Sequence, residues 1–367
     1  MLSSRCVSKI DFSHLKTEFL LIAATAMLTA CAEHPAHESA GSDHYGVAEV
    51  GSFHIGGRQA TLSGLPTKEI VFTAGAAPFK VDPNGEFEVE QMYVQYVKLF
   101  GPYARAKYPL LMWHGGGLTG VTWETKPDGR PGWQQFFLKA GHDVYVSDAV
   151  ERGRASWARY PEIFKSEPFF RTKKEAWELF RIGPAGSYAT DPAARKVHAE
   201  GTQFPVEAFD QFTKQGVPRW ATNDAATQAA YDALVQKVCP CVIIVHSQGG
   251  NFALNAALKA PDKVKAVVAV EVSGAPDPAK ADLARLKGVP HLFVWGDYVD
   301  RQELFKKISV SVDTYENALR AQGGVVDRID IPKTGVRGNS HMLMMDRNSD
   351  QIAQLVQDWM QKQGLMK

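Results

Sequence analysis

The chain has 367 residues, a length that suits one large α/β domain with insertions or two domains. Hydrophobic residues make up 45% and charged residues 22% of the chain, values typical of a globular protein with a sizeable core. The formal net charge is +1, with neither a basic stripe nor an acidic tail, and this balance argues against a nucleic-acid partner.

The N-terminal segment has the pattern of an export signal. Residues 19–28 form an apolar run that is too short to span a bilayer as a helix but suits the h-region of a secretory signal. The run ends in Leu28-Thr29-Ala30-Cys31, which resembles the bacterial lipobox, where the cysteine is lipidated. We therefore predict a signal peptide over residues 1–30 and a lipid anchor on Cys31 in the bacterial cell envelope, periplasmic or outer-membrane. A plain secretory signal and an uncleaved anchor are the alternatives.

Composition divides the rest of the chain into segments. Residues 31–48 are small, polar and proline-bearing, which predicts a flexible tether. Residues 49–149 and 221–367 carry strand and helix patterns, and we expect them to form the N-terminal and C-terminal parts of one core. Residues 150–220 interrupt this rhythm and are rich in aromatic side chains. They predict an inserted cap over the sheet, with its own core and an apolar pocket.

Short apolar runs alternate with helical patterns along the two core segments. This alternation predicts an α/β fold with a mostly parallel central sheet and helices on both faces. The expected helices cover residues 224–237, 251–260 and the C-terminal stretch around 352–360. The expected strands cover residues 70–72, 87–99, 108–113, 143–147, 242–245, 264–272, 291–295 and 325–331.

The run around Ser247 predicts a nucleophile elbow. The β-branched residues 242–245 lead directly into His246-Ser247-Gln248-Gly249-Gly250, and the helical stretch 251–260 follows. A buried strand, a sharp turn with serine at its apex and a closely packed helix expose the serine hydroxyl. The first position of the usual Gly-x-Ser-x-Gly pattern is Val245, so the match is incomplete. An ordinary strand–turn–helix with a surface serine remains the alternative.

His341 is the predicted base. A serine hydroxyl is a weak nucleophile unless a base takes its proton. His341 lies in the run 338–342, after the last expected strand, and so satisfies the known chain order of serine, acid and histidine. His291 also follows Ser247 but starts a strand, at the wrong end of the sheet. His246 is adjacent to the serine but is expected to point away from it at the elbow.

The spacing leaves the acidic partner of the histidine open. Glu271 ends the first strand after the elbow, whereas Asp297 and Asp300 follow the next strand. The second position is the more frequent one, so position alone favours an aspartate. The carboxylate holds the imidazole tautomer and stabilises the imidazolium, and either residue type serves. Asp297 and Asp300 can equally be turn or helix-capping residues.

A glycine-rich run predicts an oxyanion site. His114-Gly115-Gly116-Gly117 follows an apolar strand, and three glycines let main-chain N–H groups approach a developing negative charge. Removing one such donor typically costs about 3–4 kcal/mol of transition-state stabilisation. Together with the elbow and His341 in the expected order, this run strengthens the prediction of a catalytic serine.

The four cysteines predict no metal or redox centre. Cys6 and Cys31 lie in the predicted targeting segment, and Cys239 and Cys241 flank Pro240. A disulfide across one intervening residue departs from the preferred geometry, so we expect the second pair to be free or only transiently bonded. No cofactor is expected.

In these motifs the chain resembles the α/β-hydrolase superfamily, and within it closely resembles a group of bacterial esterases. The resemblance spans roughly residues 50 to 365. The matching stretches are residues 51–58, 113–120, 122–130, 246–248, 270–271, 338–342 and 346–348.

The resemblance implies a catalytic triad of Ser247, Glu271 and His341, against the positional preference for an aspartate. It also implies that the main-chain N–H groups of Gly116 and Gln248 form the oxyanion hole. The resemblance also implies a cap over the sheet and a homodimeric assembly. The homodimer is implied by the resemblance alone.

The chain departs from the group at one point. A known member has two adjacent cysteines where this chain has Gly116 and Gly117. The oxyanion donor is a main-chain group, so we expect the function to survive. The resulting prediction is a serine carboxylesterase acting on small-molecule esters through an acyl-enzyme. The alternatives are a lactonase, amidase or polyester hydrolase on the same residues, and a non-catalytic ligand-binding surface lipoprotein.

Overall fold

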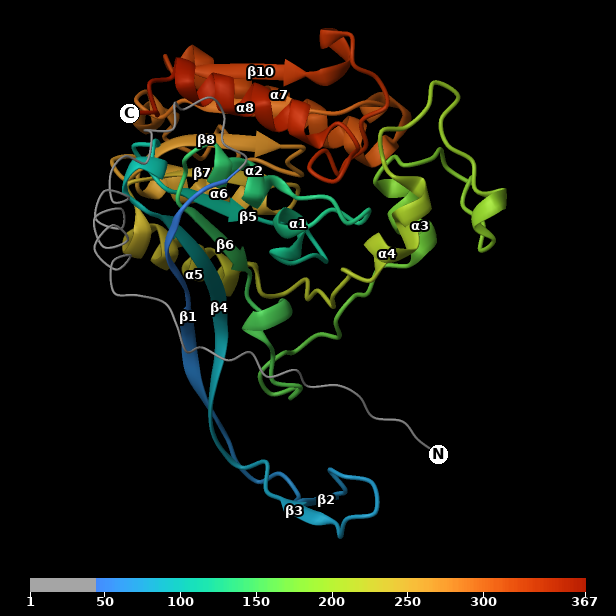
Figure 1. The fold of residues 1–367 in the computed structure, drawn as a ribbon. Coiled ribbons are helices and arrows are strands. Elements are labelled where there is room, and N and C mark those ends of the chain that lie inside the picture. Colours follow the sequence, from blue (N-terminus) through green and yellow to red (C-terminus); the bar gives the residue numbers. More distant parts are fainter. Residues whose placement is uncertain (1–43) are drawn as a thin grey trace, which may run out of the picture. The chain divides into compact units, whose positions relative to one another are not determined.

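An eight-stranded sheet organises the computed structural model, which describes residues 44–367 (Figure 1). The strand order is β1-β4-β6-β5-β7-β8-β9-β10. Neighbours from β6 to β10 run parallel, whereas β1 and β6 both pair antiparallel with β4. The strands are β1 (Val47–Leu62), β2 (Lys68–Ile70), β3 (Phe79–Val81), β4 (Gly85–Leu99), β5 (Leu110–Trp113), β6 (Val144–Asp148), β7 (Cys241–His246), β8 (Val264–Val270), β9 (His291–Trp295) and β10 (Val326–Asp330).

Helices cover both faces of this sheet. Alternate residues of each central strand point to opposite faces and join two separate apolar clusters, one of which includes Met112 and Ile244 and the other Leu111 and Ile243. Helices α2 and α8 pack on the first cluster, and α5, α6 and α7 pack on the second. The α-helices are α1 (Val121–Glu124), α2 (Trp133–Lys139), α3 (Lys173–Leu179), α4 (Phe209–Thr213), α5 (Asp224–Val238), α6 (Gly249–Lys259), α7 (Glu303–Ala321) and α8 (Ser349–Lys362).

This arrangement confirms the predicted α/β fold class with a mostly parallel sheet. Every residue of β5, β7 and β9 is buried, because each strand has a neighbour on both sides and helices on both faces. Such strands are continuous apolar runs, which is why the sequence pattern predicts them well. Short 3-10 helices complete the fold: η1 (Gly101–Tyr103), η2 (Gly153–Ala155), η3 (Pro192–Ala194), η4 (Val206–Ala208), η5 (Leu283–Leu286), η6 (Val299–Arg301) and η7 (Ile331–Thr334).

The long strand β1 is absent from the strands expected from the sequence. It pairs only with β4, most of its residues are exposed, and it contains Gly56 and Gly57, so it lacks the apolar pattern of a buried strand. It begins at Val47, inside the last two positions of the predicted tether. The strand expected at residues 70–72 is instead β2, which ends at Ile70 and pairs with β3. The signal peptide, Cys31 and most of the tether lie outside the described residues.

Residues 150–220 form no strand and contain only short helices, namely η2, α3, η3, η4 and α4. Most of their aromatic side chains are gathered in two groups. One group packs against Leu62 and Val89 of the β1–β4 hairpin, and the other extends the cluster that α2 and α8 cover. The first group is Trp157, Phe164 and Trp220, and the second is Trp177, Phe180, Phe204, Phe209 and Phe212.

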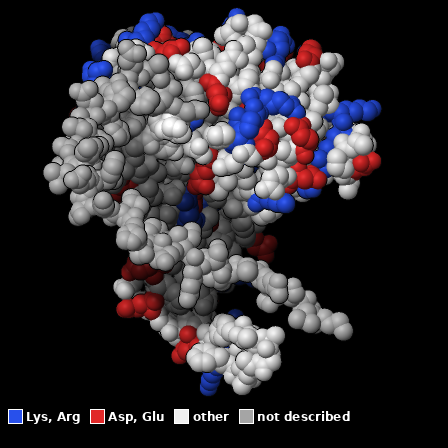
Figure 2. Space-filling model, in the orientation of Figure 1, with Lys and Arg blue, Asp and Glu red and all other residues white. Residues whose placement is uncertain are grey.

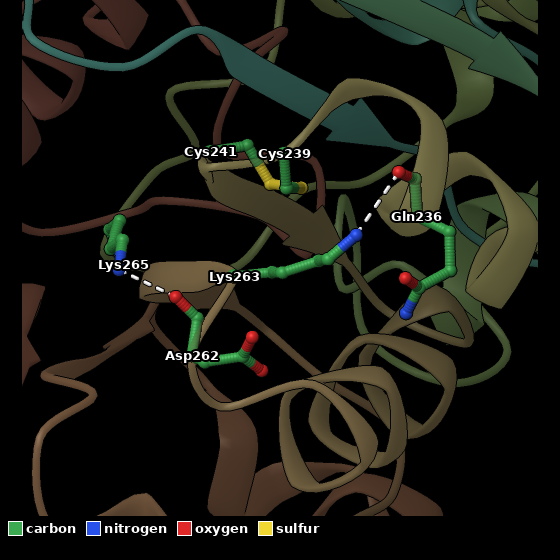
Figure 3. Close-up of a disulfide and its surroundings, with 6 residues drawn as sticks. All are labelled: Gln236, Cys239, Cys241, Asp262, Lys263 and Lys265. Atoms are coloured by element: carbon green, nitrogen blue, oxygen red, sulfur yellow. Dashed lines mark hydrogen bonds between the residues drawn. A yellow bond between two sulfur atoms is a disulfide. The ribbon is translucent and has the colours of Figure 1, made fainter.

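Cys239 and Cys241 form a disulfide, so the expectation of free or transiently bonded thiols is wrong (Figure 3). The chain bends at Pro240, between the end of α5 and the start of β7, and brings the two Cα atoms to 4.3 Å. This lies just below the usual separation of about 4.4–6.8 Å. Lys263 donates to the carbonyl of Gln236 nearby, at 3.2 Å. The disulfide lies at the start of β7, the end remote from Ser247.

Acidic and basic side chains are interspersed on the face shown in Figure 2, in keeping with the small net charge. Within residues 44–367, no helix has the length and apolarity to cross a membrane. Nor does this part of the chain contain a group of three or more His, Cys, Asp and Glu residues that could hold a metal ion.

The start of α6 packs tightly on the segment that follows β8, and a substitution at Gly250 tests this packing. A Cβ atom there would lie 2.3 Å from Cγ1 of Val272. Alanine gains about 1 kcal/mol over glycine in a helix, but overpacking costs about 1–3 kcal/mol. We therefore expect Gly250→Ala to lower the midpoint of urea unfolding. Gly288→Ala is the control, because nothing lies within 4 Å of its Cβ position. Equal midpoints for both variants would contradict the close packing.

Candidate active site

Ser247 occupies a sharp turn between β7 and α6. Its φ of 52° lies in the left-handed region, which is strained for a residue with a side chain. The turn is held by main-chain hydrogen bonds: Ser247 N–H donates to Val270 O, and Gly250 N–H donates to Ser247 O. The local geometry is that of a nucleophile elbow, although Val245 replaces the usual glycine.

His341 contacts Ser247 on one side and Glu271 on the other. Its Nε2 lies 3.0 Å from Ser247 Oγ, and its Nδ1 lies 3.1 Å from Glu271 Oε2. These contacts assign the tautomer, because Nδ1 must donate to the carboxylate and Nε2 must accept from the hydroxyl. The structure therefore brings the three residues together from the segments that follow β7, β8 and β10.

The loop that carries His341 is fixed by a buried carboxylate. Asp346 accepts from Ser340 N–H at 2.8 Å, Ser340 Oγ–H at 2.7 Å and Asn339 Nδ2 at 2.9 Å. Burial raises the pKa of Asp346 to about 6. His341 N–H also donates to the carbonyl of Phe180, at 2.9 Å. The main chain at His341 is thus fixed, and the polar residues Asn339 and Ser340 serve to bind Asp346.

Glu271 is fully buried, and both of its carboxylate oxygens have partners. It follows β8 with a φ of 49°, and its N–H donates to Val294 O. Oε1 accepts from Gly296 N–H and from Arg181 Nη2, each at 2.6 Å, while Oε2 faces His341. Burial raises the pKa of Glu271, and the Arg181 cation opposes this rise.

Arg181 is a site residue that the sequence did not reveal. It comes from the 150–220 segment, its side chain is 1% exposed, and its φ is 58°. Besides Glu271, its Nε donates to the carbonyl of Asp297 at 2.8 Å, and its guanidinium lies over the ring of Phe305. No motif surrounds Arg181, so only the folded chain shows that it reaches the buried carboxylate.

The two aspartates that position alone favours do not contact His341. Asp297 Oδ2 accepts from Arg337 Nε at 2.7 Å and from Gly338 N–H at 2.9 Å. Asp300 is exposed in η6. His341 therefore contacts the glutamate that the resemblance implies, rather than an aspartate at the more frequent position.

The two other histidines considered as the base, His246 and His291, bind main-chain carbonyl groups instead of Ser247. His246 Nε2 lies 3.0 Å from the carbonyl of His341, and burial lowers its pKa well below the ordinary value. His291 Nδ1 lies 2.8 Å from the carbonyl of Val289 at the start of β9, and burial lowers its pKa to about 4. Both are neutral at neutral pH, and neither forms the contact with Ser247 that His341 forms.

The glycine run after β5 passes directly beside the elbow. A Cβ on Gly115 would lie 2.9 Å from Cβ of Ser247 and 2.8 Å from Nδ1 of His246, so only glycine fits. His114 fixes the run, since its Nδ1 contacts Gly115 O at 2.8 Å and its Nε2 accepts from Ala149 N–H at 3.0 Å. Burial lowers the pKa of His114 to about 4, which keeps the ring neutral.

Gly116 and Gln248 lie next to each other at the turn. A Cβ on Gly116 would lie 2.9 Å from Oε1 of Gln248 and 2.9 Å from Nη1 of Arg219. Within residues 44–367, neither main-chain N–H group has a hydrogen-bond acceptor. Both remain available to a ligand, as the predicted oxyanion hole requires.

A small pocket opens beside the glycine run. The glycine run and the 150–220 segment line it together, so the segment forms one wall of the site. Phe180, one of the lining residues, packs against His341 with ring centroids 5.3 Å apart. The principal lining residues are Gly116, Gly117, Leu118, Arg171, Phe180 and Phe212.

Known proteins are similar to this chain in fold and in sequence. Residues 239–329 match the family model described as alpha/beta hydrolase fold. A solved structure described as a novel bacterial esterase is 33% identical, with a TM-score of 0.71, and the match covers 87% of this chain and 97% of that chain. A fungal protein named "Probable secreted lipase phiG" is 26% identical over an alignment of 341 positions that covers 76% of this chain and 88% of that protein. The chain belongs to the α/β-hydrolase family.

The pair formed by Arg181 and Glu271 yields a stability prediction. Arg181→Met leaves a buried carboxylate without its charge partner, which costs about 3–5 kcal/mol. We expect a clear fall in the midpoint of urea unfolding. Arg301→Gln is the control, because it breaks an exposed pair with Glu200. The double variant Arg181→Met/Glu271→Gln removes both charges and should recover part of the loss. Equal midpoints for the two single variants would contradict this reasoning.

Proposed function

We propose that the protein is a serine carboxylesterase whose triad is Ser247, His341 and Glu271. The observation that carries the proposal is the continuous set of contacts from Ser247 Oγ to His341 Nε2, at 3.0 Å, and from His341 Nδ1 to Glu271 Oε2, at 3.1 Å. The solved relative described as a bacterial esterase and the fungal relative named as a lipase support ester hydrolysis.

In the first half-reaction, Ser247 Oγ attacks the carbonyl carbon of the ester while His341 Nε2 takes the hydroxyl proton. The carbonyl oxygen becomes an oxyanion, which the N–H groups of Gly116 and Gln248 stabilise. The intermediate collapses, the bond to the alcohol oxygen breaks, and His341 gives its proton to the departing alcohol. The acyl group then remains on Ser247 as an ester.

In the second half-reaction, a water molecule takes the place of the alcohol. His341 Nε2 accepts a proton from the water as its oxygen adds to the acyl carbon. The second intermediate collapses, the bond to Ser247 Oγ breaks, and the proton returns from His341 to the serine oxygen. The carboxylic acid leaves, and no cofactor takes part in either half-reaction.

The electrostatic surroundings of His341 suit a general base. Burial, followed by the Arg181 and Arg171 cations, lowers its pKa well below the ordinary value. The imidazole is therefore neutral at neutral pH and can accept a proton. Glu271 keeps the ring in the productive tautomer and stabilises the imidazolium that forms during the reaction.

The remaining parts of the proposal concern access and location. Residues 150–220 act as the cap, because Arg181 and Phe180 reach the triad from this segment. The protein is exported, which the fungal relative's name as a secreted lipase supports, and Cys31 carries a lipid anchor.

Cys31→Ser should abolish incorporation of labelled palmitate and release the protein from membranes. Palmitate labelling that persists in this variant would contradict the anchor.

Ser247→Ala tests the nucleophile. Loss of Oγ removes the covalent pathway, so we expect kcat for a p-nitrophenyl ester to fall by about 10³-fold or more, with an unchanged unfolding midpoint. A fluorophosphonate probe should label the wild type at Ser247, as mass spectrometry of the labelled peptide would show. Labelling of a different serine, or full activity in the variant, would rule out this nucleophile.

Glu271→Gln tests whether Glu271, rather than Asp297, is the catalytic carboxylate that partners His341. An amide at this place can donate to Nδ1 and select the wrong tautomer, which costs about 10⁴-fold in kcat in a related triad. Asp297→Asn should cost far less, because Asp297 bonds to Arg337 and Gly338. The exposed Asp300→Asn is the control. Greater loss in Asp297→Asn than in Glu271→Gln would assign the acid to Asp297.

A further inference from the structure

Four arginines lie around the triad and the glycine run, and three of them have a carboxylate partner. The fourth, Arg219, has no carboxylate within ion-pair distance among residues 44–367, and Asp224 and Glu151 attract its charge only from farther away. The three pairs are Arg152–Glu151, Arg171–Glu175 and Arg181–Glu271.

The main chain at Arg219 is fixed on both sides. Arg219 N–H donates to Phe169 O at 2.9 Å, and Phe169 N–H donates to Arg219 O at 2.7 Å. The next residue, Trp220, is buried, and its N–H donates to Glu151. The guanidinium projects from this anchored position to Gly116, where Nη1 lies 2.9 Å from the Cβ position of the glycine.

The surroundings of Arg219 disfavour an isolated cation. Its Nε is buried and has no hydrogen-bond partner among the described residues. Burial, followed by repulsion from Arg152, lowers the pKa of Arg219 below its ordinary value. A cation in partly buried surroundings is stabilised by an opposite charge with matching geometry. The planar fork of an arginine matches a carboxylate with two parallel N–H···O bonds.

A second guanidinium, that of Arg171, lies on this side of the site and pairs with Glu175. Arg171 lines the pocket beside Gly116 and Gly117. Its guanidinium lies 5.3 Å from the centroid of the Phe180 ring, which in turn packs against His341. A ligand in the pocket therefore lies beside Gly116, one of the two proposed oxyanion donors, and beside the Arg171 guanidinium.

We propose that Arg219 binds an anionic group of the substrate, so that the protein prefers esters that bear a carboxylate near the scissile bond. The inference rests on the proposed esterase function and narrows its substrate class. The carboxylate pairs with the Arg219 guanidinium while the ester carbonyl faces Ser247 and the N–H groups of Gly116 and Gln248.

The test compares two pairs of esters that differ mainly in charge. In the first pair, p-nitrophenyl hydrogen glutarate carries the carboxylate on the acyl side, and the p-nitrophenyl ester of isoheptanoic acid is its neutral isostere. In the second pair, p-carboxyphenyl acetate and p-isopropylphenyl acetate place the difference on the alcohol side. In at least one pair, we expect the wild type to show kcat/KM about tenfold or more higher for the anionic ester.

The variant Arg219→Gln should abolish this ratio, and Arg219→Lys should keep part of it because a lysine retains the charge without the planar fork. Arg58→Gln is the matched control, since it removes one positive charge on β1, where Arg58 pairs with Glu90. We expect the control to leave the ratio unchanged. Raising the ionic strength should reduce the wild-type ratio, because the anion is only partly shielded from solvent.

The outcomes separate the two proposals. A wild type that hydrolyses charged and neutral esters equally in both pairs overturns the anion site and leaves the esterase proposal intact. If Arg219→Gln lowers kcat/KM equally for the charged and the neutral ester of a pair, Arg219 acts on the oxyanion. That result also overturns the anion site. A wild type that hydrolyses none of the esters overturns the esterase proposal itself. The wild-type ratio of kcat/KM between the anionic and the neutral ester is decisive by itself. The test therefore does not depend on whether the Arg219 variants fold.

Discussion

The buried contact between Arg181 and Glu271 is the interaction on which the geometry around His341 depends. The two side chains are at most 1% exposed, and their charged groups lie 2.6 Å apart. A buried carboxylate loses several kcal/mol of hydration unless its oxygens are fully paired. Arg181, Gly296 and His341 provide those partners. Since Arg181 belongs to the 150–220 segment, the carboxylate side of the site is complete only when that segment is folded against the sheet.

The sheet imposes the second constraint, because its adjacent parallel strands end at one edge. Ser247 and Glu271 follow β7 and β8, and both adopt left-handed backbone conformations. Such residues cost about 1–3 kcal/mol each and persist only where the surrounding structure over-determines them. Here the buried strands and the glycines at positions 115 and 250 provide that support, since no larger residue fits at either glycine. The strained turns direct both side chains towards His341.

The fold was predictable wherever the burial of a segment left a pattern in its residues. Strands β5, β7, β8 and β9 are apolar runs because they are covered on both faces, and α8 has an apolar stripe because one side faces the core. Strand β1 left no such pattern, because its main-chain pairing with β4 does not require apolar side chains. The disulfide between Cys239 and Cys241 depends on a bend at Pro240, which the spacing of the cysteines does not reveal.

The sequence by itself determined the fold class and indicated Ser247, His341 and the glycine run, because these features depend on local order along the chain. It left the acid open among Glu271, Asp297 and Asp300, and resemblance alone favoured the glutamate. The tertiary structure decided which carboxylate touches His341, and it brought Arg181 to the same point. Such contacts join residues about a hundred positions apart, as Arg181 and Glu271 do with a separation of 90. Long-range pairing follows from how the segments pack, and no local pattern records it.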